Sequence, residues 1–251
     1  HLEQSPVLQA HAQREMTCFV NPESWAEGEG ALQRLYFPQA TTQKRLIKDV
    51  MLMGSAAGLS RLQVSSPDVK VVVMLREPAA RAWSAYNYAR SRGIEDATSF
   101  AEALALEPQR RAADTLQQRA NLYLYNSTYA EKVLQLQALF GEANVLVVYS
   151  SDYRADPELW LGRIAALMRE DLFPDGPPDL AAHNRAAQAR SQTVATLLAK
   201  LFRSRGVFRR LLRSVLPSTW TTAARHKLLG LNRVERDNDP IPADAAERIR
   251  A

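Results

Sequence analysis

The 251-residue sequence has a single cysteine, Cys18, so it cannot form an internal disulfide framework. Its longest uninterrupted apolar run, residues 71–75, is also short. A segment that crosses a bilayer needs roughly 18 apolar residues. No basic segment followed by an apolar stretch opens the chain. We therefore expect a soluble protein without a transmembrane segment. The scarcity of cysteine favours a reducing compartment, and we expect a cytoplasmic location.

Several motifs of known chemistry are missing. No group of His, Cys and Asp residues has metal-ligand spacing, and no Gly-x-Ser-x-Gly segment marks a hydrolase nucleophile. Zinc-finger spacing and RNA-binding signatures are absent too, so no nucleic-acid partner is expected. The Gly-x-x-x-x-Gly-Lys-Ser/Thr loop of P-loop kinases does not occur, which argues against a kinase without excluding one.

Basic residues outnumber acidic ones, with a formal charge of +5. Arginines gather between Arg185 and Arg213, interleaved with apolar side chains. This pattern is typical of amphipathic helices with a solvated basic face, and it is also compatible with an anionic ligand or surface. Charge alone does not decide between these interpretations.

Strand-like and helix-like patterns alternate along the first two thirds of the chain. The predicted strands are 70–75, 144–149 and, less clearly, 46–52, and the predicted helices are 78–92, 99–106, 128–140 and 157–169. Alternation of this kind indicates an open parallel sheet covered by helices on both faces, which is an α/β fold. We expect a single domain over residues 1–251, with a sheet-forming part at 1–172. A proline-rich loop at 173–178 separates it from a mainly helical part at 179–251.

The most informative segment runs from residue 69 to residue 86. A buried strand ends at Arg76, and a helix that starts with Pro78 carries Ser84 in its second turn. In open α/β sheets, ligands bind beyond the carboxyl ends of the strands, where an arginine fork can hold two phosphate oxygens. From these residues alone the alternatives stay open: Arg76 could pair with a carboxylate, and Ser84 could bond back to its own helix.

This segment resembles the 3′-phosphate-binding strand and helix of sulfotransferases that use 3′-phosphoadenosine 5′-phosphosulfate (PAPS). The shared pattern is an apolar strand, Leu-Arg, an acidic residue, Pro, Arg, an aromatic residue and Ser, with eight residues from Arg76 to Ser84. The resemblance covers about residues 2–170 and is closest to the heparan-sulfate type and its bacterial relatives. It implies a P-loop-type fold, with Arg76 and Ser84 holding the 3′-phosphate of PAPS or of the product PAP. No metal is required.

The resemblance also suggests catalytic residues. Residues 11–19 resemble the family's Lys-Glu-x-x-Phe-Phe segment, in which the glutamate is the general base, and this implies that role for Glu15. Lys48 lies where the family has Glu-Lys-Ser/Thr-Pro, and it would stabilise the transferring sulfonate or orient the acceptor. Arg185 follows the proline-rich loop, where the family folds a segment over the nucleotide, and is a further candidate contact to PAPS.

One element of the family pattern is absent. The Lys-x-Gly-Thr-Thr loop that holds the 5′-phosphosulfate should lie just before Leu2, and the sequence stops at Ala251 within a helix-like segment that begins near Pro242. We therefore expect the sequence to be truncated at both ends. The acceptor is expected to be a hydroxyl of a carbohydrate, lipid, polyketide-like chain or small molecule, and the oligomeric state is not encoded. Two alternatives stay open at this point: a P-loop small-molecule kinase, and a catalytically inactive sulfotransferase-like binding domain.

Overall fold

The computed structural model describes residues 1–11, 16–39, 43–113, 119–180, 187–189, 233–235 and 241–250. Contacts divide the chain into two compact units. Unit 1 comprises His1–Glu77 and Thr128–Ala181, and unit 2 comprises Pro78–Ser127 and Ala182–Ala251. The expected single domain stays a prediction. No helix in the described ranges is long and apolar enough to cross a membrane.

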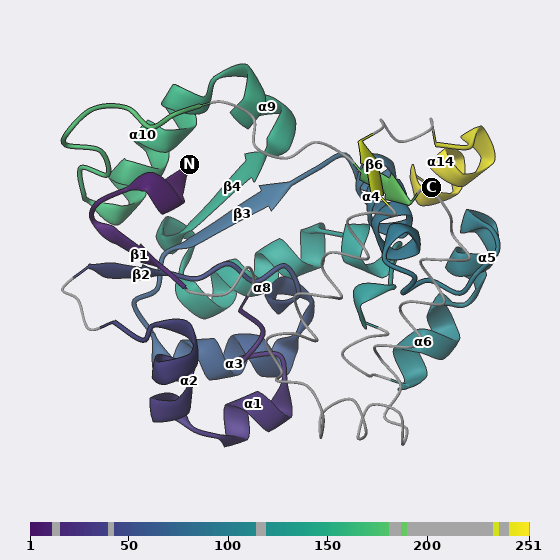
Figure 1. Cartoon of the computed structure of the whole chain (residues 1–251), viewed down its shortest axis with the longest axis horizontal. Helices are drawn as coiled ribbons and strands as arrows, with labels where there is room; N and C mark the ends of the chain where they lie inside the picture. The colour runs from purple at the N-terminus through teal and green to yellow at the C-terminus, as the bar shows by residue number, and fades with distance from the viewer. Residues whose placement is uncertain are drawn as a thin grey trace. The chain divides into compact units, whose positions relative to one another are not determined.

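Unit 1 contains the parallel strands found in the described residues and the helices that cover them (Figure 1). Its elements, in chain order, are η1 Leu2–Gln4, β1 Leu8–Ala10, α1 Pro22–Ala26, α2 Glu29–Tyr36, β2 Lys44–Leu46, η2 Leu52–Gly54, α3 Ala56–Ser65, β3 Val71–Leu75, α8 Ala130–Phe140, η4 Glu142–Asn144, β4 Val145–Tyr149, α9 Ser150–Ala155 and α10 Pro157–Met168.

Strands β3 and β4 pair in parallel with Val71 opposite Val145 and Leu75 opposite Tyr149. Successive side chains of a strand point to opposite faces, and both faces of this pair are apolar. On one face, Val73 and Val145 pack in a cluster with residues of α3 and α8. On the other face, Val72 packs in a cluster with residues of α10. Helices therefore cover both faces of parallel strands, and the predicted α/β fold is confirmed.

A second parallel pair joins β1 to β2, with Leu8 opposite Lys44 and Ala10 opposite Leu46. Leu8 and Leu46 belong to the same apolar cluster as Val72 of β3. Sequence analysis did not predict β1, because three residues between a proline and a histidine carry too little alternation to distinguish a strand from a loop.

Helix boundaries in unit 1 follow local chemistry. Asp156 caps α10 by accepting a hydrogen bond from the backbone N–H of Leu159, and Pro157 occupies the first turn, where its missing N–H has no cost. Ser55 caps α3 through the N–H of Gly58. A side chain at Gly58 would crowd Leu52 and the carbonyl of Phe19, so glycine lets α3 approach its neighbours closely.

The predicted strand over 46–52 was wrong in position. Strand β2 ends at Leu46, and the chain turns into η2 from Leu52. The turn forms because Oδ1 of Asp49 accepts hydrogen bonds from the N–H groups of Met51 and Leu52, at 2.8 Å and 3.1 Å. An aspartate that bonds to N–H groups two and three residues ahead favours a turn over a strand ladder.

Unit 2 is mainly helical in its first segment, with α4 Pro78–Ser91, α5 Phe100–Ala105, α6 Glu107–Ala113 and η3 Tyr125–Ser127. Its core gathers alanines of α4 around Tyr86, Phe100 and Tyr123. In the C-terminal part, the described residues form an antiparallel pair, β5 Ala187–Ala189 with β6 Arg233–Glu235, and the helix α14 Ala243–Arg250. This strand pair was not expected in a part predicted to be helical.

Candidate functional site

The carboxyl ends of β1 and β2 lie at the same edge, because the two strands are parallel and Ala10 pairs with Leu46. Lys48 comes two residues after Leu46, the last residue of β2. The backbone N–H of Met16 donates a hydrogen bond of 2.9 Å to the carbonyl of Lys48, so the chain that leaves β1 returns to the chain that leaves β2. Glu15, the predicted general base, lies outside the described residues and immediately precedes Met16 in the sequence.

The side chain of Lys48 is about half exposed, at 52% of its full accessible area. Its Nζ lies 3.8 Å from Oε1 of Glu3, whose side chain is 63% exposed. An ion pair of this length between exposed groups contributes little stability, so it holds the ammonium only weakly. Lys48 is therefore accessible to an anionic ligand at the carboxyl ends of β1 and β2.

Cys18, two residues after Met16, is fully buried and packs in the apolar cluster that includes residues of α3 and α8. Burial, and then the negative charge of Asp49, raise the pKa of its thiol to about 11. The thiol therefore stays protonated near neutral pH and is a packing residue, since a reactive cysteine requires the thiolate.

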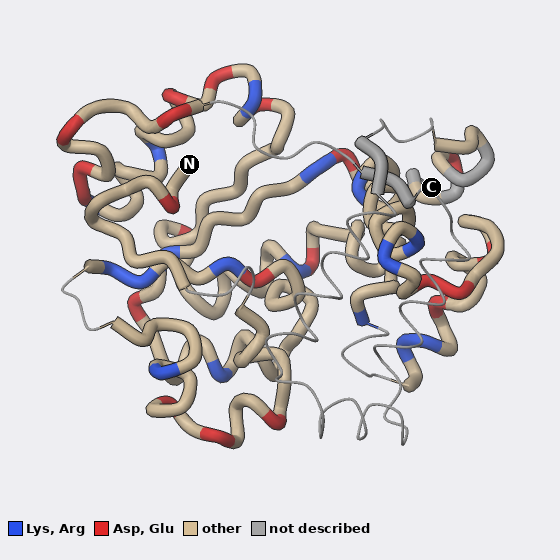
Figure 2. The backbone as a smooth tube through the Cα atoms, in the orientation of Figure 1, with Lys and Arg blue, Asp and Glu red and all other residues tan. Residues whose placement is uncertain are grey.

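Arg76 directly follows the carboxyl end of β3, and its side chain is exposed. Figure 2 marks the Lys and Arg positions in blue and the Asp and Glu positions in red along the backbone. In the sequence, Arg76 is followed by the acidic Glu77. Among the described residues, no ion pair involves Arg76. The parallel register places the end of β4, at Tyr149, beside Leu75. This edge of unit 1 thus presents an exposed guanidinium where open α/β sheets bind ligands.

Ser84 lies on α4 in unit 2 and is partly buried. The helix around it is held by aromatic packing: Trp83 stacks on Tyr86 with ring centroids 5.6 Å apart, and Tyr86 meets the ring of Tyr123 edge to face. Arg76 belongs to unit 1 and Ser84 to unit 2, so the surroundings of each are described within its own unit. Arg185 lies outside the described residues.

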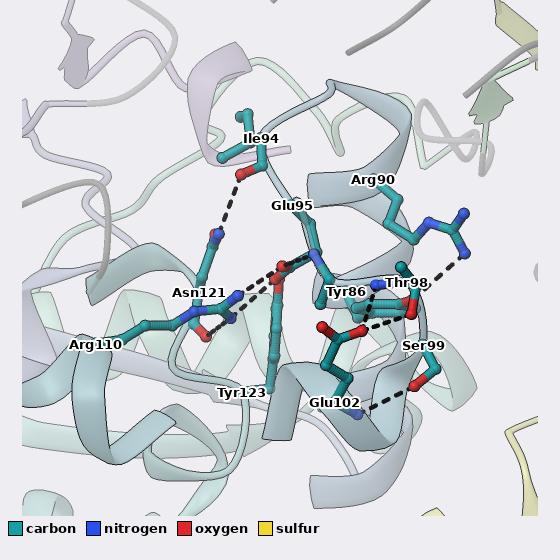
Figure 3. A network of polar contacts seen from close by, with 11 residues as sticks. Tyr86, Arg90, Ile94, Glu95, Thr98, Ser99, Glu102, Arg110, Asn121 and Tyr123 are labelled. Carbon is teal, nitrogen blue, oxygen red and sulfur yellow. Dashed lines mark hydrogen bonds and ion pairs between the residues drawn. The ribbon is translucent and has the colours of Figure 1, made fainter. Parts of the chain in front are cut away.

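Unit 2 also contains a buried polar network that sequence analysis missed (Figure 3). Glu95, Arg110 and Tyr123 meet there, although 15 residues separate Glu95 from Arg110 and 28 separate it from Tyr123. No local pattern signals contacts over such separations. Glu107, also buried, accepts hydrogen bonds from the N–H groups of Leu124 and Tyr125.

Across the ranges that the structure describes, no three His, Cys, Asp or Glu side chains group in a way that could hold a metal ion. Lys48 and Arg76 supply positive charge at carboxyl ends of parallel strands, and Ser84 supplies a hydroxyl.

Two comparisons with known proteins give matches. A sequence model described as the sulfotransferase domain matches residues 21–207, a range that includes Lys48, Arg76, Ser84 and Arg185 but not Glu15. The structure is similar to the crystal structure of a sulfotransferase from Alicyclobacillus acidocaldarius, with a TM-score of 0.61 and 21% sequence identity over 94% of this chain and 89% of that one. At this identity the similarity shows the fold. No curated protein matches the sequence.

Proposed function

Because the chain belongs to the sulfotransferase family, whose domain matches residues 21–207, we propose that it transfers a sulfuryl group from PAPS to an acceptor hydroxyl. The observation that carries this proposal is Arg76, an exposed arginine at the carboxyl end of a buried parallel strand. Sulfotransferases are enzymes that use PAPS, and the fold of this chain is α/β with parallel strands flanked by helices.

The donor is held at its 3′-phosphate by Arg76 and Ser84. The guanidinium donates two parallel N–H groups to phosphate oxygens, and the Ser84 hydroxyl donates a third hydrogen bond. Support comes from the exposed position of Arg76 and from the partly buried position of Ser84 on a helix that begins at Pro78. Arg185 adds a further contact to the nucleotide in this proposal.

The transfer is a direct in-line displacement. Glu15 takes the proton from the acceptor hydroxyl while the oxygen of that hydroxyl forms a bond to sulfur. At the same time, the bond between sulfur and the phosphate oxygen of PAPS breaks. PAP leaves with that oxygen. The hydrogen bond between Met16 and Lys48 supports this role. Met16 directly follows Glu15 in the sequence, so the bond holds the residue next to Glu15 beside Lys48, just after β2.

Lys48 stabilises the negative charge on the transferring sulfonate or orients the acceptor hydroxyl. Placement and electrostatics supply the catalysis in such a transfer, as in phosphoryl transfer, and no covalent enzyme intermediate is needed. We propose that the reaction also needs no metal. The weak contact to Glu3 supports the role of Lys48, because its ammonium can turn to a ligand at little energetic cost.

The acceptor is a hydroxyl of a carbohydrate, lipid, polyketide-like chain or small molecule, and the specificity lies in loops rather than in a sequence motif. The family match spans parts of both units, which supports the proposal that residues 1–251 act as a single sulfotransferase domain. A cytoplasmic location is proposed from the single Cys18, which is a free and buried thiol.

A transfer assay tests the proposed function. The natural protein is incubated with PAPS labelled on sulfur and a panel of phenol, sugar and lipid alcohols, with and without a metal chelator. We expect labelled ester and PAP in equal amounts, unchanged by the chelator. Magnesium-dependent transfer of phosphate from ATP would overturn the proposal in favour of a kinase, and tight PAP binding without any transfer would identify an inactive binding domain.

A further inference from the structure

Unit 2 contains a fully buried carboxylate, that of Glu95. The side chain of Glu95 has no exposed area, whereas that of its partner Arg110 is 11% exposed. Arg110 donates to both carboxylate oxygens, from Nη2 at 2.6 Å and from Nη1 at 2.9 Å, and the hydroxyl of Tyr123 donates at 2.6 Å (Figure 3). The backbone N–H of Ala97 adds a fourth hydrogen bond, at 2.8 Å.

These contacts fix the protonation states of the network. Burial by itself would raise the pKa of Glu95, but the hydrogen bonds from Arg110, Tyr123 and Ala97 lower it below its usual value. Burial, and then the contact with Glu95, raise the pKa of Tyr123. Glu95 is therefore ionised and Tyr123 remains a donor, so each hydrogen bond of the network has one defined direction.

Tyr123 connects this carboxylate to helix α4. Its carbonyl accepts a hydrogen bond of 3.2 Å from Nη1 of Arg81, and its ring meets the ring of Tyr86 edge to face, with centroids 5.8 Å apart. Arg81 and Tyr86 lie on either side of Ser84, three residues before it and two after it. The stretch of α4 that carries Ser84 is thus held from both sides by one residue, Tyr123.

Stability alone does not explain such a network. Replacing a buried ion pair by apolar side chains of similar volume is often neutral or stabilising, because desolvation of the charges offsets their attraction. What the charges add is geometry, since a bidentate arginine–carboxylate contact admits few arrangements. A phosphate contact from a short serine side chain requires that geometry, because a binding group must be held within about 0.5 Å of its productive position.

We propose that Glu95 is a positioning residue for the nucleotide site, acting through Tyr123 to set the place of Ser84 on α4. The inference rests on the proposed function, since Ser84 is assigned there to the 3′-phosphate of PAPS. Glu95 itself touches no ligand. On nucleotide binding, its effect is confined to the preference for a 3′-phosphorylated nucleotide.

The experiment compares affinities for PAP and for adenosine 5′-phosphate, which lacks the 3′-phosphate, by calorimetry on the full chain. Glu95→Gln keeps the shape and removes the charge, and Tyr123→Phe keeps the ring and removes the donor to Glu95. We expect each to reduce the preference for PAP, by about tenfold for Glu95→Gln, while the affinity for adenosine 5′-phosphate stays unchanged. Glu102→Gln is the matched control, because Glu102 is an exposed carboxylate of the same region that accepts hydrogen bonds from Thr98. The preference of this variant for PAP over adenosine 5′-phosphate should equal that of the wild type.

A double variant separates positioning from folding. In a Ser84→Ala background, Glu95→Gln should have no further effect on the preference, because the group that Glu95 positions is already gone. A lower melting temperature with an unchanged preference in both Glu95→Gln and Tyr123→Phe would overturn the inference. If Ser84→Ala alone leaves the preference intact, the assignment of Ser84 fails instead, so the two failures are distinguishable.

Discussion

Met16 and Lys48 are joined by a backbone hydrogen bond of 2.9 Å, from the N–H of Met16 to the carbonyl of Lys48. The bond closes the edge at which the parallel strands β1 and β2 end. Met16 is 3% exposed, so the bond lies in a packed environment while the Lys48 side chain extends toward solvent. A fixed backbone with an exposed, weakly paired ammonium suits a group that must stabilise charge developing in the transition state.

Lys48→Ala should lower kcat by about 10² to 10³, the usual cost of removing one donor to charge that develops in the transition state. The melting temperature should stay nearly constant, because the contact with Glu3 joins two exposed groups. Steady-state kinetics and thermal unfolding measure the two effects. Glu3→Gln is the control, since it removes the ion pair and leaves the lysine, and its kcat should equal that of the wild type.

Glu15→Gln keeps the size of the side chain and removes its ability to accept a proton. Turnover should fall by about 10² to 10⁴ while the affinity for PAP is unchanged, because a general base acts on the acceptor and not on the donor. Radiolabelled transfer and calorimetry give the two values. Near wild-type turnover in this variant would remove Glu15 from the mechanism.

Asp49 fixes the turn that follows Lys48 through its bonds to the N–H groups of Met51 and Leu52. Asp49→Ala should lower the free energy of unfolding by about 1 kcal/mol, the typical value of such a cap. Asp49→Asn retains the acceptor oxygen and should keep most of that stability. Urea unfolding of both variants checks this, and equal losses in the two would show that the charge of Asp49, rather than the turn, is what stabilises the chain.

The lowered pKa of Glu95 predicts a contribution to acid stability. Because the folded-state pKa lies below the unfolded value of about 4.3, ionised Glu95 contributes stability that is fully present above that value. This stability is lost as the pH falls through the folded-state pKa. In urea unfolding across about pH 6 to pH 2, the wild type should therefore lose more stability than Glu95→Gln.

Glu107 provides the matched control for that pH series. Burial raises the pKa of Glu107, so its contribution has the opposite sign and is lost as the pH rises through the folded-state pKa. Glu107→Gln should therefore lose more stability than the wild type on acidification. If Glu95→Gln and the wild type have parallel pH profiles, the ionised state assigned to Glu95 is wrong.

The sequence predicted those elements whose signals are local. Helix α10 begins at Pro157 after its cap Asp156, and strands β3 and β4 coincide with the two β-branched apolar runs. The position of β2 was not predictable in the same way, because Asp49 ends the strand by side-chain bonds that apolar periodicity does not register. Strand β1 was missed because its three residues depend on pairing with β2.

The candidate site residues also differ in whether a local sequence signal identifies them. Arg76 was recognisable because a strand, an arginine and a helix-starting proline follow one another directly in the sequence. Glu95 was not, since its partners Arg110 and Tyr123 are distant in the chain and an isolated glutamate is most often a surface residue. Tertiary contacts alone bring these three side chains together.

The most direct measurement of the central claim is the calorimetric affinity of the protein for PAP and for adenosine 5′-phosphate. A charge-assisted contact contributes about 1.5 to 3 kcal/mol, so PAP should bind roughly 10-fold to 150-fold more tightly than the nucleotide without the 3′-phosphate. Arg76→Ala should remove most of this difference, whereas Arg163→Ala, which removes an arginine that packs over Trp160 of α10, should retain it. Equal affinities of the wild type for the two nucleotides would contradict the account.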